Sequence, residues 1–386
     1  MRPPDPTCTH SGNLRILMTI NVEKLVNPRA LKAAKYDMKH VTVCWEHDGE
    51  IQRAMSNESA YSPLESVQAA IRDIAGKVNW YPEDASECAS LRDKLAAYAS
   101  VQRENVTLAN GSMELLDILF QTFIAQPGVD EVILVAPDYT AYSIRARLFG
   151  AVTRFAIGGE DTDKVADNIL ELVTPRTKFV LLSRPNNPTG KVMRTEDVLH
   201  ILDSGVLTVV DEAYIELADE GTEVAPWINS RDNLIVSRTF SKAFGLAGLR
   251  LGYVLATPQI IHYVNLVRHV FNVNLVAMVA AEASLNDMDN VKARIDEQRQ
   301  TREWLTEQIA RVPGLRPIPS QGNFILVDIA DAGKKPEEFV SQLLNRGIFV
   351  RDFSKKYGLE PDRYFRITVG QRQDMERLAQ VLQSIC

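Results

Sequence analysis

The chain has few of the patterns that mark membrane, secreted or metal-binding proteins. No apolar stretch in its 386 residues reaches the roughly 18 that a membrane span needs, and the first residues lack the apolar core of a signal peptide. None of its six histidines stands in a paired-ligand pattern. Its four cysteines lie far apart without metal-ligand spacing: Cys8, Cys44, Cys88 and Cys386. We therefore expect free thiols, no metal site and a cytoplasmic location.

The chain also lacks the charge and glycine patterns of nucleic-acid and nucleotide sites. The net charge is −7 and no Lys/Arg-rich block stands out, which argues against a nucleic-acid surface. The spacing around Gly245 and Gly248 departs from the G-x-G-x-x-G of dinucleotide sites, and Lys191 is followed by Val192, where a Walker A loop has Ser or Thr. With 45% hydrophobic and 24% charged residues, the composition is that of a soluble globular protein.

The most informative segment is RTFSKAFGLAGLRLGY, residues 238–253, which contains Lys242. A lysine amine can form a Schiff base with an aldehyde. The neighbouring Ser241 and Arg250 can hold a phosphate. An aldehyde and a phosphate on one small molecule suggest pyridoxal 5′-phosphate (PLP). From this segment alone, a plain surface lysine is an equally good interpretation.

Two upstream segments favour the cofactor. The apolar run at residues 179–182 leads into SRPNNPTG, which contains Asn187, and the run at residues 209–210 ends on Asp211 and continues to Tyr214. In an open α/β sheet, ligands collect beyond the carboxyl ends of the strands. A carboxylate there would keep a pyridine nitrogen protonated, and the cationic ring would then act as the electron sink. Asn187 and Tyr214 can donate hydrogen bonds to the ring's phenolate oxygen.

The order of apolar runs predicts an α/β fold. Strands are expected near residues 106–109, 131–135, 152–155, 178–183, 207–210, 233–237 and 252–256. Their alternation with helical patterns calls for a mostly parallel sheet between helices. We also expect a helix from Pro63 with Ser62 as its N-cap, a helix at 86–98 and one long amphipathic helix at 274–312. The segment FNVN at residues 271–274 is expected to lead into that long helix.

The C-terminal part is expected to form a smaller, separate α+β unit. Strands at 323–328 and 363–369, a helix at 336–345 and a final helix to residue 385 make it up. We predict an N-terminal arm and the start of the small domain at 1–55, with about the first 12 residues disordered. A large PLP-binding domain is predicted at 56–275 and a small domain at 276–386.

Several ordered motifs together resemble one family. NNPTG at 186–190, DEAY at 211–214, SKAFGLAGLR at 241–250, FNVN at 271–274, GIFVRD at 347–352 and RITVG at 366–370 match it nearly letter for letter. The chain resembles a fold-type-I PLP-dependent aminotransferase of class I/II, in the histidinol-phosphate aminotransferase family, from about residue 56 to the end. The resemblance implies ping-pong transfer of an amino group from a histidinol-phosphate-like or other amine to a 2-oxo acid, with Lys242 as internal aldimine and proton carrier.

The resemblance also implies a set of site residues. The catalytic residues would be Lys242, Asp211 and Tyr214, and the substrate anion would be held by Arg366 with help from Arg351. A homodimer with shared active sites is implied, because Tyr61 would reach the phosphate of the other subunit. The cofactor would be bound by Tyr61, Ser112, Met113, Tyr139, Asn187, Asp211, Tyr214, Thr239, Ser241, Lys242 and Arg250.

Plainer interpretations stay open for some of these residues. Ser112 could simply cap a helix after the turn at Gly111, and Arg351 beside Asp352 could form a structural ion pair. Tyr142, one helical step after Tyr139, fits a packing role better than a site role. Met113 stands where the family usually has Asp.

Other functions also stay open. A PLP-dependent decarboxylase or lyase on the same fold would share the cofactor residues, and a regulatory protein could use the fold to sense a ligand. Arg184 replaces the family's usual Asn, and residues 1–50 depart from the family's pattern. The amine could therefore be a different one, as in another biosynthetic aminotransferase.

Overall fold

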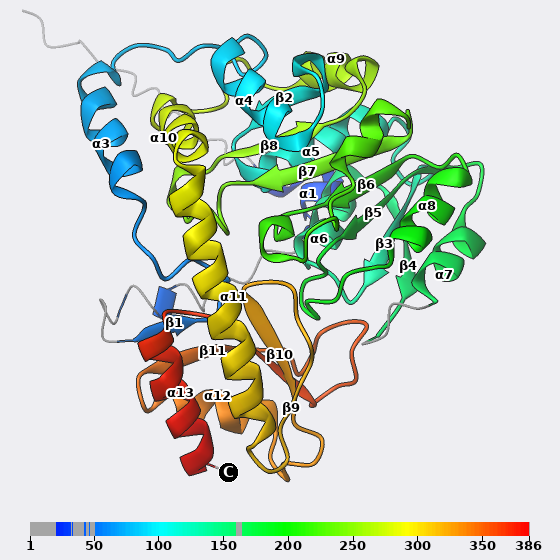
Figure 1. Ribbon diagram of the computed structural model, residues 1–386. Helices are drawn as coiled ribbons and strands as arrows, with labels where there is room; N and C mark the ends of the chain where they lie inside the picture. Colours follow the sequence, from blue (N-terminus) through cyan, green and yellow to red (C-terminus); the bar gives the residue numbers. More distant parts are fainter. Residues whose placement is uncertain are drawn as a thin grey trace, which may run out of the picture.

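In a computed structural model, the chain is described at residues 21–31, 33, 42–43, 46, 51–159 and 164–385. Two sheets dominate it (Figure 1): a seven-stranded sheet in one half and a five-stranded sheet in the other. The predicted disorder of about the first 12 residues lies outside the described part. The division into domains at 55/56 and 275/276 stays a prediction.

The larger sheet has the order β2-β8-β7-β6-β5-β3-β4. Its strands pair in parallel except for β8, which is antiparallel to both β2 and β7. All seven predicted strands form, so the predicted α/β fold class is confirmed. Their bounds are β2 Val106–Ala109, β3 Glu131–Ala136, β4 Val152–Ile157, β5 Thr177–Ser183, β6 Thr208–Asp211, β7 Leu234–Thr239 and β8 Gly252–Leu255.

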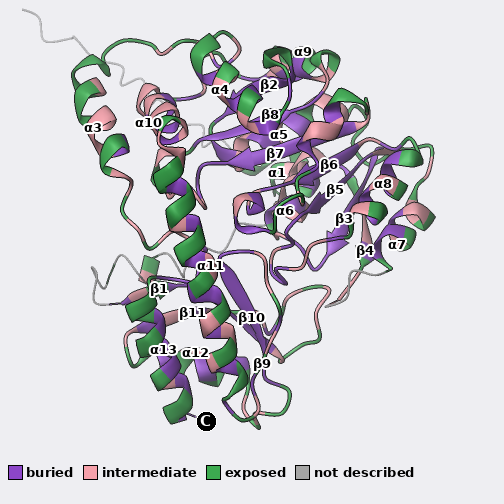
Figure 2. Ribbon diagram, viewed as in Figure 1, coloured by how far each residue is buried: buried purple, intermediate pink, exposed green. Residues whose placement is uncertain are grey.

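Helices cover both faces of this sheet because its strands are apolar on both sides. Along β5, Phe179 and Leu181 pack on the face that carries α5, α6 and α9. Val180 and Leu182 point to the other face, against α4, α7, α8 and α10. Figure 2 shows the strands buried between these layers. The helices are α4 Ala89–Ala99, α5 Gly111–Phe123, α6 Ala141–Phe149, α7 Val165–Leu172, α8 Thr195–Asp203, α9 Pro258–Val267 and α10 Leu275–Asn286.

The smaller sheet has the order β1-β11-β12-β10-β9 and packs against α11, α12 and α13. Strands β10 and β12 and both helices of the C-terminal prediction form, whereas β1, β9 and β11 were not predicted. β1 is a three-residue strand that pairs in parallel with β11, far from it in sequence. The bounds are β1 Gln52–Ala54, β9 Arg316–Pro317, β10 Phe324–Asp328, β11 Ile348–Asp352, β12 Tyr364–Thr368, α12 Pro336–Leu344 and α13 Arg372–Ile385.

The prediction of one long helix at 274–312 is wrong. The chain forms two helices, α10 and α11 Met288–Ala310, separated at Asp287 (Figure 1). The Asp287 carboxylate accepts hydrogen bonds from Ser66 Oγ at 2.5 Å and Asn290 Nδ2 at 2.7 Å. Such side-chain bonds compete with the helical backbone pattern. The predicted helix entry holds, since Asn274 Oδ1 accepts from the Ala277 backbone N–H at 2.8 Å.

The predicted N-cap at Ser62 is also wrong. Helix α3 spans Glu65–Ile74 and follows Leu64, which provides no side-chain cap. A short helix α1, Pro28–Leu31, lies against α6, where Arg29 Nη1 donates to the Phe149 carbonyl at 2.9 Å. Within the described residues, no helix is long and apolar enough to cross a membrane.

Candidate active site

A cavity of about 710 Å³ lies where the carboxyl ends of the central strands face β11 and β12. Every predicted site residue except Tyr61 lines it. Parallel strands place their carboxyl ends at one edge, which is why residues distant in sequence meet there. The predicted residues that line it are Ser112, Met113, Tyr139, Asn187, Asp211, Tyr214, Thr239, Ser241, Lys242, Arg250, Arg351 and Arg366.

Asp211 ends β6 and is 5% exposed. Its carboxylate accepts hydrogen bonds from the Tyr142 hydroxyl at 2.6 Å and the Ala213 backbone N–H at 3.1 Å. Burial raises the pKa of Asp211, and these two hydrogen bonds oppose that rise. A buried carboxylate with neutral partners favours a cationic group on a ligand bound in the cavity. The packing role expected for Tyr142 is therefore incomplete, because its hydroxyl orients Asp211.

Tyr214 is the centre of a hydrogen-bonded group on the next loop. Its hydroxyl accepts from Asn57 Nδ2 at 2.9 Å and from Asn187 Nδ2 at 3.2 Å. The hydroxyl proton therefore points away from both amides, as a donor. Asn57 is buried, lines the cavity and was missed by the sequence argument. The signal available was its place in the segment Asn57-Glu58-Ser59-Ala60-Tyr61, where only the tyrosine was considered.

Lys242 lies on the loop after β7, with its amine in the cavity. Its Nζ donates to the Ser56 carbonyl at 3.2 Å and lies 5.8 Å from the centre of the Tyr214 ring. Burial lowers the pKa of Lys242 to about 8; the positive charge of Arg366 adds to this effect, and Glu58 opposes it. A fraction of this amine is thus neutral, and nucleophilic, near neutral pH.

A phosphate-sized cup forms where α5 begins. Ser112 stands in the first turn of the helix, whose backbone N–H groups are free to bind an anion. Ser241 Oγ lies 3.0 Å from Thr239 Oγ1 and 3.5 Å from Arg250 Nη1. Gly111 is required here, because it adopts φ +77° and a Cβ would lie 2.4 Å from Arg250 Nη2.

Tyr139 and Met113 border the cavity together. The Tyr139 hydroxyl lies 3.8 Å from Met113 Sδ, and its ring meets the Tyr142 ring edge-on, with centroids 5.6 Å apart. Tyr139 is thus packed against Tyr142 while its side chain lines the cavity that also contains Asp211. This arrangement suits a flat ring bound in the cavity.

Arg351 and Arg366 stand directly opposite each other on the antiparallel strands β11 and β12. Arg366 is buried, and its two Nη atoms donate to Asn187 Oδ1 at 2.5 Å and the Met55 carbonyl at 3.0 Å. Its guanidinium also lies against the rings of Phe324 and Phe353. No ion pair between Arg351 and Asp352 is formed in the described part of the chain, and both residues line the cavity. Two guanidinium groups on one wall have the charge and geometry to bind a carboxylate or a phosphate.

Two other residues of the sequence argument lie elsewhere. Tyr61 is not in the cavity wall; it lies beside α11, with the Arg294 guanidinium 6.0 Å from its ring centre, and burial raises its pKa to about 12. Arg184 is 1% exposed and donates to the Met193 carbonyl at 2.8 Å and Thr195 Oγ1 at 3.1 Å. It joins two segments away from the cavity. Arg184, which stands where the family usually has Asn, therefore makes no contact with a substrate in the cavity.

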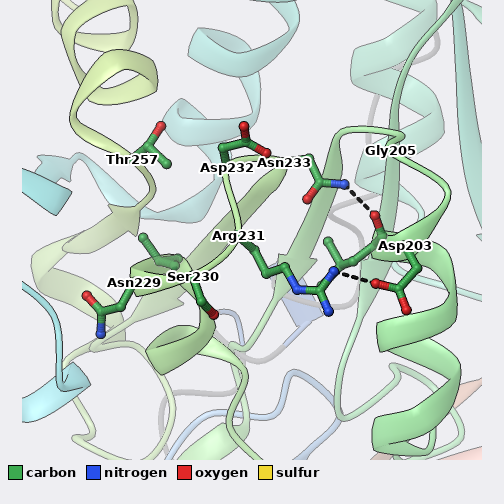
Figure 3. A pocket seen from close by; sticks show the side chains of 10 residues that line it. Asp203, Gly205, Asn229, Ser230, Arg231, Asp232, Asn233 and Thr257 are labelled. Atoms are coloured by element: carbon green, nitrogen blue, oxygen red, sulfur yellow. Dashed lines mark hydrogen bonds and ion pairs between the residues drawn. The ribbon is translucent and has the colours of Figure 1, made fainter.

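A second hollow, of about 580 Å³, lies at the opposite ends of the strands (Figure 3). Its ion pair and its main hydrogen bonds lie within the protein. Arg231 forms an ion pair with Asp203, and Asn233 Nδ2 donates to the Leu202 and Val206 carbonyls at 2.8 and 3.0 Å. The first cavity, where lysine, carboxylate and arginines converge, is therefore the candidate active site.

Known proteins agree with this assignment. The aminotransferase class I and II family matches residues 55–382. A histidinol-phosphate aminotransferase of Thermoanaerobacter sp. is 36% identical over 90% of this chain and 95% of its own. One of Methanocaldococcus jannaschii is 32% identical over 87% and 89%. The structure of the Sinorhizobium meliloti enzyme in complex with PLP has a TM-score of 0.81, with 27% identity over 94% of this chain and 98% of that one.

The fold alone does not separate aminotransferases from other PLP enzymes. An L-threonine-O-3-phosphate decarboxylase structure from Porphyromonas gingivalis has a TM-score of 0.75 at 21% identity, with 86% of this chain and 98% of that one covered. The family match and the curated relatives decide the class. The chain belongs to the class I and II aminotransferases, in the histidinol-phosphate aminotransferase family, and is a PLP-dependent aminotransferase.

Proposed function

We propose that the protein transfers the amino group of a histidinol-phosphate-like amine to a 2-oxo acid, with Lys242 as the amine that holds PLP and moves the substrate proton. One observation carries the proposal: the Lys242 amine and the buried Asp211 carboxylate line the same cavity, which Arg351 and Arg366 also line. The specific amine comes from the names of the curated relatives.

The residues present fit PLP. The Asp211 carboxylate, whose pKa burial raises, would bind a protonated pyridine nitrogen. The Asn187 and Tyr214 side chains, joined at 3.2 Å, would bind the ring oxygen. The cup of Ser112, Thr239, Ser241 and Arg250 would take the phosphate, with Met113 acting through its backbone. PLP, when bound, supplies an aldehyde that links to amines and a cationic ring that withdraws electrons from the substrate Cα.

The protein's own residues would do four things. Tyr142 and the Ala213 N–H hold Asp211 in place as the counter-charge. Tyr139 would pack against the cofactor ring. The Lys242 amine would remove the proton from the substrate Cα as a general base and, as a general acid, deliver it to the carbon on the other side of the amino nitrogen. Arg366 and Arg351 would orient the substrate so that this proton faces Lys242.

The test is an amino-donor screen with the purified, PLP-loaded protein. Histidinol phosphate with 2-oxoglutarate should give glutamate, and other amines should react more slowly. Carbon dioxide release from an amino-acid donor, without glutamate, would support the decarboxylase alternative instead. A substrate preference for another amine would keep the reaction class and overturn the proposed substrate.

We also propose a homodimer in a cytoplasmic location. Apolar side chains are exposed on the part of the molecule that carries the 78–81 loop and the segment before α10: Trp80, Tyr81, Val270 and Phe271 are 66%, 83%, 75% and 43% exposed. The Tyr81 and Phe271 rings stack with centroids 4.9 Å apart. Such a patch is typical of a subunit contact, and most homo-oligomers are twofold dimers.

The dimer has two direct tests. Light scattering should report twice the mass of one chain, and a monomer would refute the dimer. Mixing inactive Tyr61→Ala and Lys242→Ala proteins should restore part of the activity in hybrid dimers, because each hybrid keeps one complete site. Cell fractionation tests the location.

A further inference from the structure

The connection between β11 and β12, residues 353–363, begins at the two substrate-facing strands and extends to the other sheet. Arg351 stands just before it, on β11, and Arg366 just after it, on β12. Phe353, its first residue, places its ring 5.0 Å from the Arg366 guanidinium carbon. Movement of this connection would therefore displace both arginines.

Three contacts fasten residues 356–358 to the larger sheet. Lys356 Nζ donates to the Asp138 carbonyl and, at 2.8 Å, to Thr140 Oγ1. The Tyr357 ring meets the Phe155 ring of β4 edge-on at 4.9 Å. Gly358, at φ +88°, approaches the chain so closely that a Cβ would lie 2.4 Å from the Pro137 backbone nitrogen. These contacts hold the connection between β11 and β12 against the loop that follows β3 and against β4.

Lys356 is the polar member of this set and also lines the cavity. Burial lowers its pKa to about 8, the Asp138 carboxylate opposes that effect, and the charges of Arg366 and Arg351 add to it. The Asp138 carboxylate is itself bound by the backbone N–H groups of Tyr139 at 2.7 Å and Ser183 at 3.0 Å. Lys356 thus attaches to the backbone of the loop that presents Tyr139 to the cavity.

We propose that Lys356 is a positioning residue, an inference that rests on the proposed function. Lys356 attaches residues 353–358 to the loop at Asp138 and Thr140, a contact called the latch below. The latch holds Arg351 and Arg366 at the cavity. The latch joins the two walls of the site, one for the cofactor and one for the substrate anion. Lys356 adds a third positive charge to those of Arg351 and Arg366. The latch therefore matters most for substrates that carry an anionic group.

The first test measures the latch without any catalysis. In hydrogen exchange with mass spectrometry, a peptide covering residues 353–363 should exchange faster in Lys356→Met than in the wild type, while a peptide from α13 stays unchanged. Lys356→Arg, which keeps the charge and donors, should restore slow exchange. Unchanged exchange in Lys356→Met would overturn the latch, whatever the substrate of the enzyme is.

The second test separates KM from kcat. Loss of a charge-assisted hydrogen bond should raise the KM of Lys356→Met for histidinol phosphate about tenfold. We expect kcat to stay within about threefold and KM for histidinol, which lacks the phosphate, to change little, because binding and not chemistry is affected. Lys356→Arg should recover most of the affinity. Lys292→Met, at an exposed lysine on α11 that does not line the cavity, removes the same charge and serves as the control, with little change expected.

The outcomes distinguish this inference from the proposed function. If the wild type transfers no amino group, the proposed function fails while the exchange experiment still decides on the latch. If the wild type is active and Lys292→Met raises KM as much as Lys356→Met, net charge and not a specific latch sets affinity, and the inference is wrong. An equal loss of kcat for both amines would also overturn it.

Discussion

The Tyr142 hydroxyl donates a 2.6 Å hydrogen bond to Asp211 Oδ2, and both side chains are buried. The bond joins the helix after β3 to the end of β6. It fixes the carboxylate plane and favours the charged form of Asp211, whose pKa burial raises. Tyr142 is therefore part of the site through Asp211.

Replacing Tyr142 with Phe should lower kcat/KM about tenfold, because a hydrogen bond to a charged group contributes roughly 1.5–3 kcal/mol. PLP affinity should fall as well, measured by equilibrium dialysis. Tyr263→Phe, at a tyrosine that is 53% exposed, is the matched control. Full activity in Tyr142→Phe would show that Asp211 needs no such support.

Asp211→Asn should still bind PLP but lose activity, because a neutral amide cannot stabilise a pyridinium charge. A shift of one unit in the pKa of the pyridine nitrogen corresponds to about 1.4 kcal/mol. Catalysis needs the pyridinium to be stabilised by several such units. Steady-state kinetics at saturating PLP measure the effect. Activity within about threefold of the wild type would contradict the role of Asp211.

Lys242 should be the residue that PLP modifies. Borohydride reduction of the loaded protein, followed by peptide mapping, should place the label on residue 242, and Lys242→Ala should lose more than the ~10²–10⁴-fold typical of one general base. Lys356 is the alternative site of modification, because it also lines the cavity and its pKa is lowered to about 8. Label on Lys356 would contradict the assignment.

The pH dependence of cofactor capture follows from the lowered pKa of Lys242. Its amine is protonated below a pH of about 8 and neutral above it, so capture of PLP by the apoprotein should rise with pH and level off above about 8. Capture increases with pH, and does not decrease, because only the neutral amine attacks the aldehyde. Arg366→Gln removes a nearby positive charge and should shift the midpoint upward. A midpoint near the ordinary lysine value would refute the burial argument.

Arg366→Lys should raise KM for both amine and 2-oxo acid, by tenfold or more, because lysine lacks the two-pronged guanidinium. The sequence alone suggests that PLP affinity stays nearly unchanged. The structure modifies this expectation, since Arg366 donates to Asn187 at 2.5 Å and Asn187 donates to Tyr214. A moderate loss of PLP affinity should accompany the rise in KM. If the substitution releases the cofactor and leaves KM unchanged, Arg366 binds the cofactor and not the substrate anion.

The amino-acid sequence alone determined the larger sheet and the strand ends that carry Asn187, Asp211 and Lys242. Buried parallel strands are continuous apolar runs, and each run ends at a polar residue that the sheet must place at one edge. This local information is enough to bring together residues from several loops. It also explains why the predicted site residues of the larger sheet line one cavity, whereas Arg351 and Arg366 reach that cavity from the smaller sheet.

Tertiary structure alone decided the contacts that join segments far apart in the chain. Asn57 lies beside Tyr214 across 157 positions, and Lys356 beside Asp138 across 218. The break at Asp287 is likewise made with Ser66, 221 positions away. No local pattern encodes such pairs, because a side chain's partner depends on where packing brings another backbone segment.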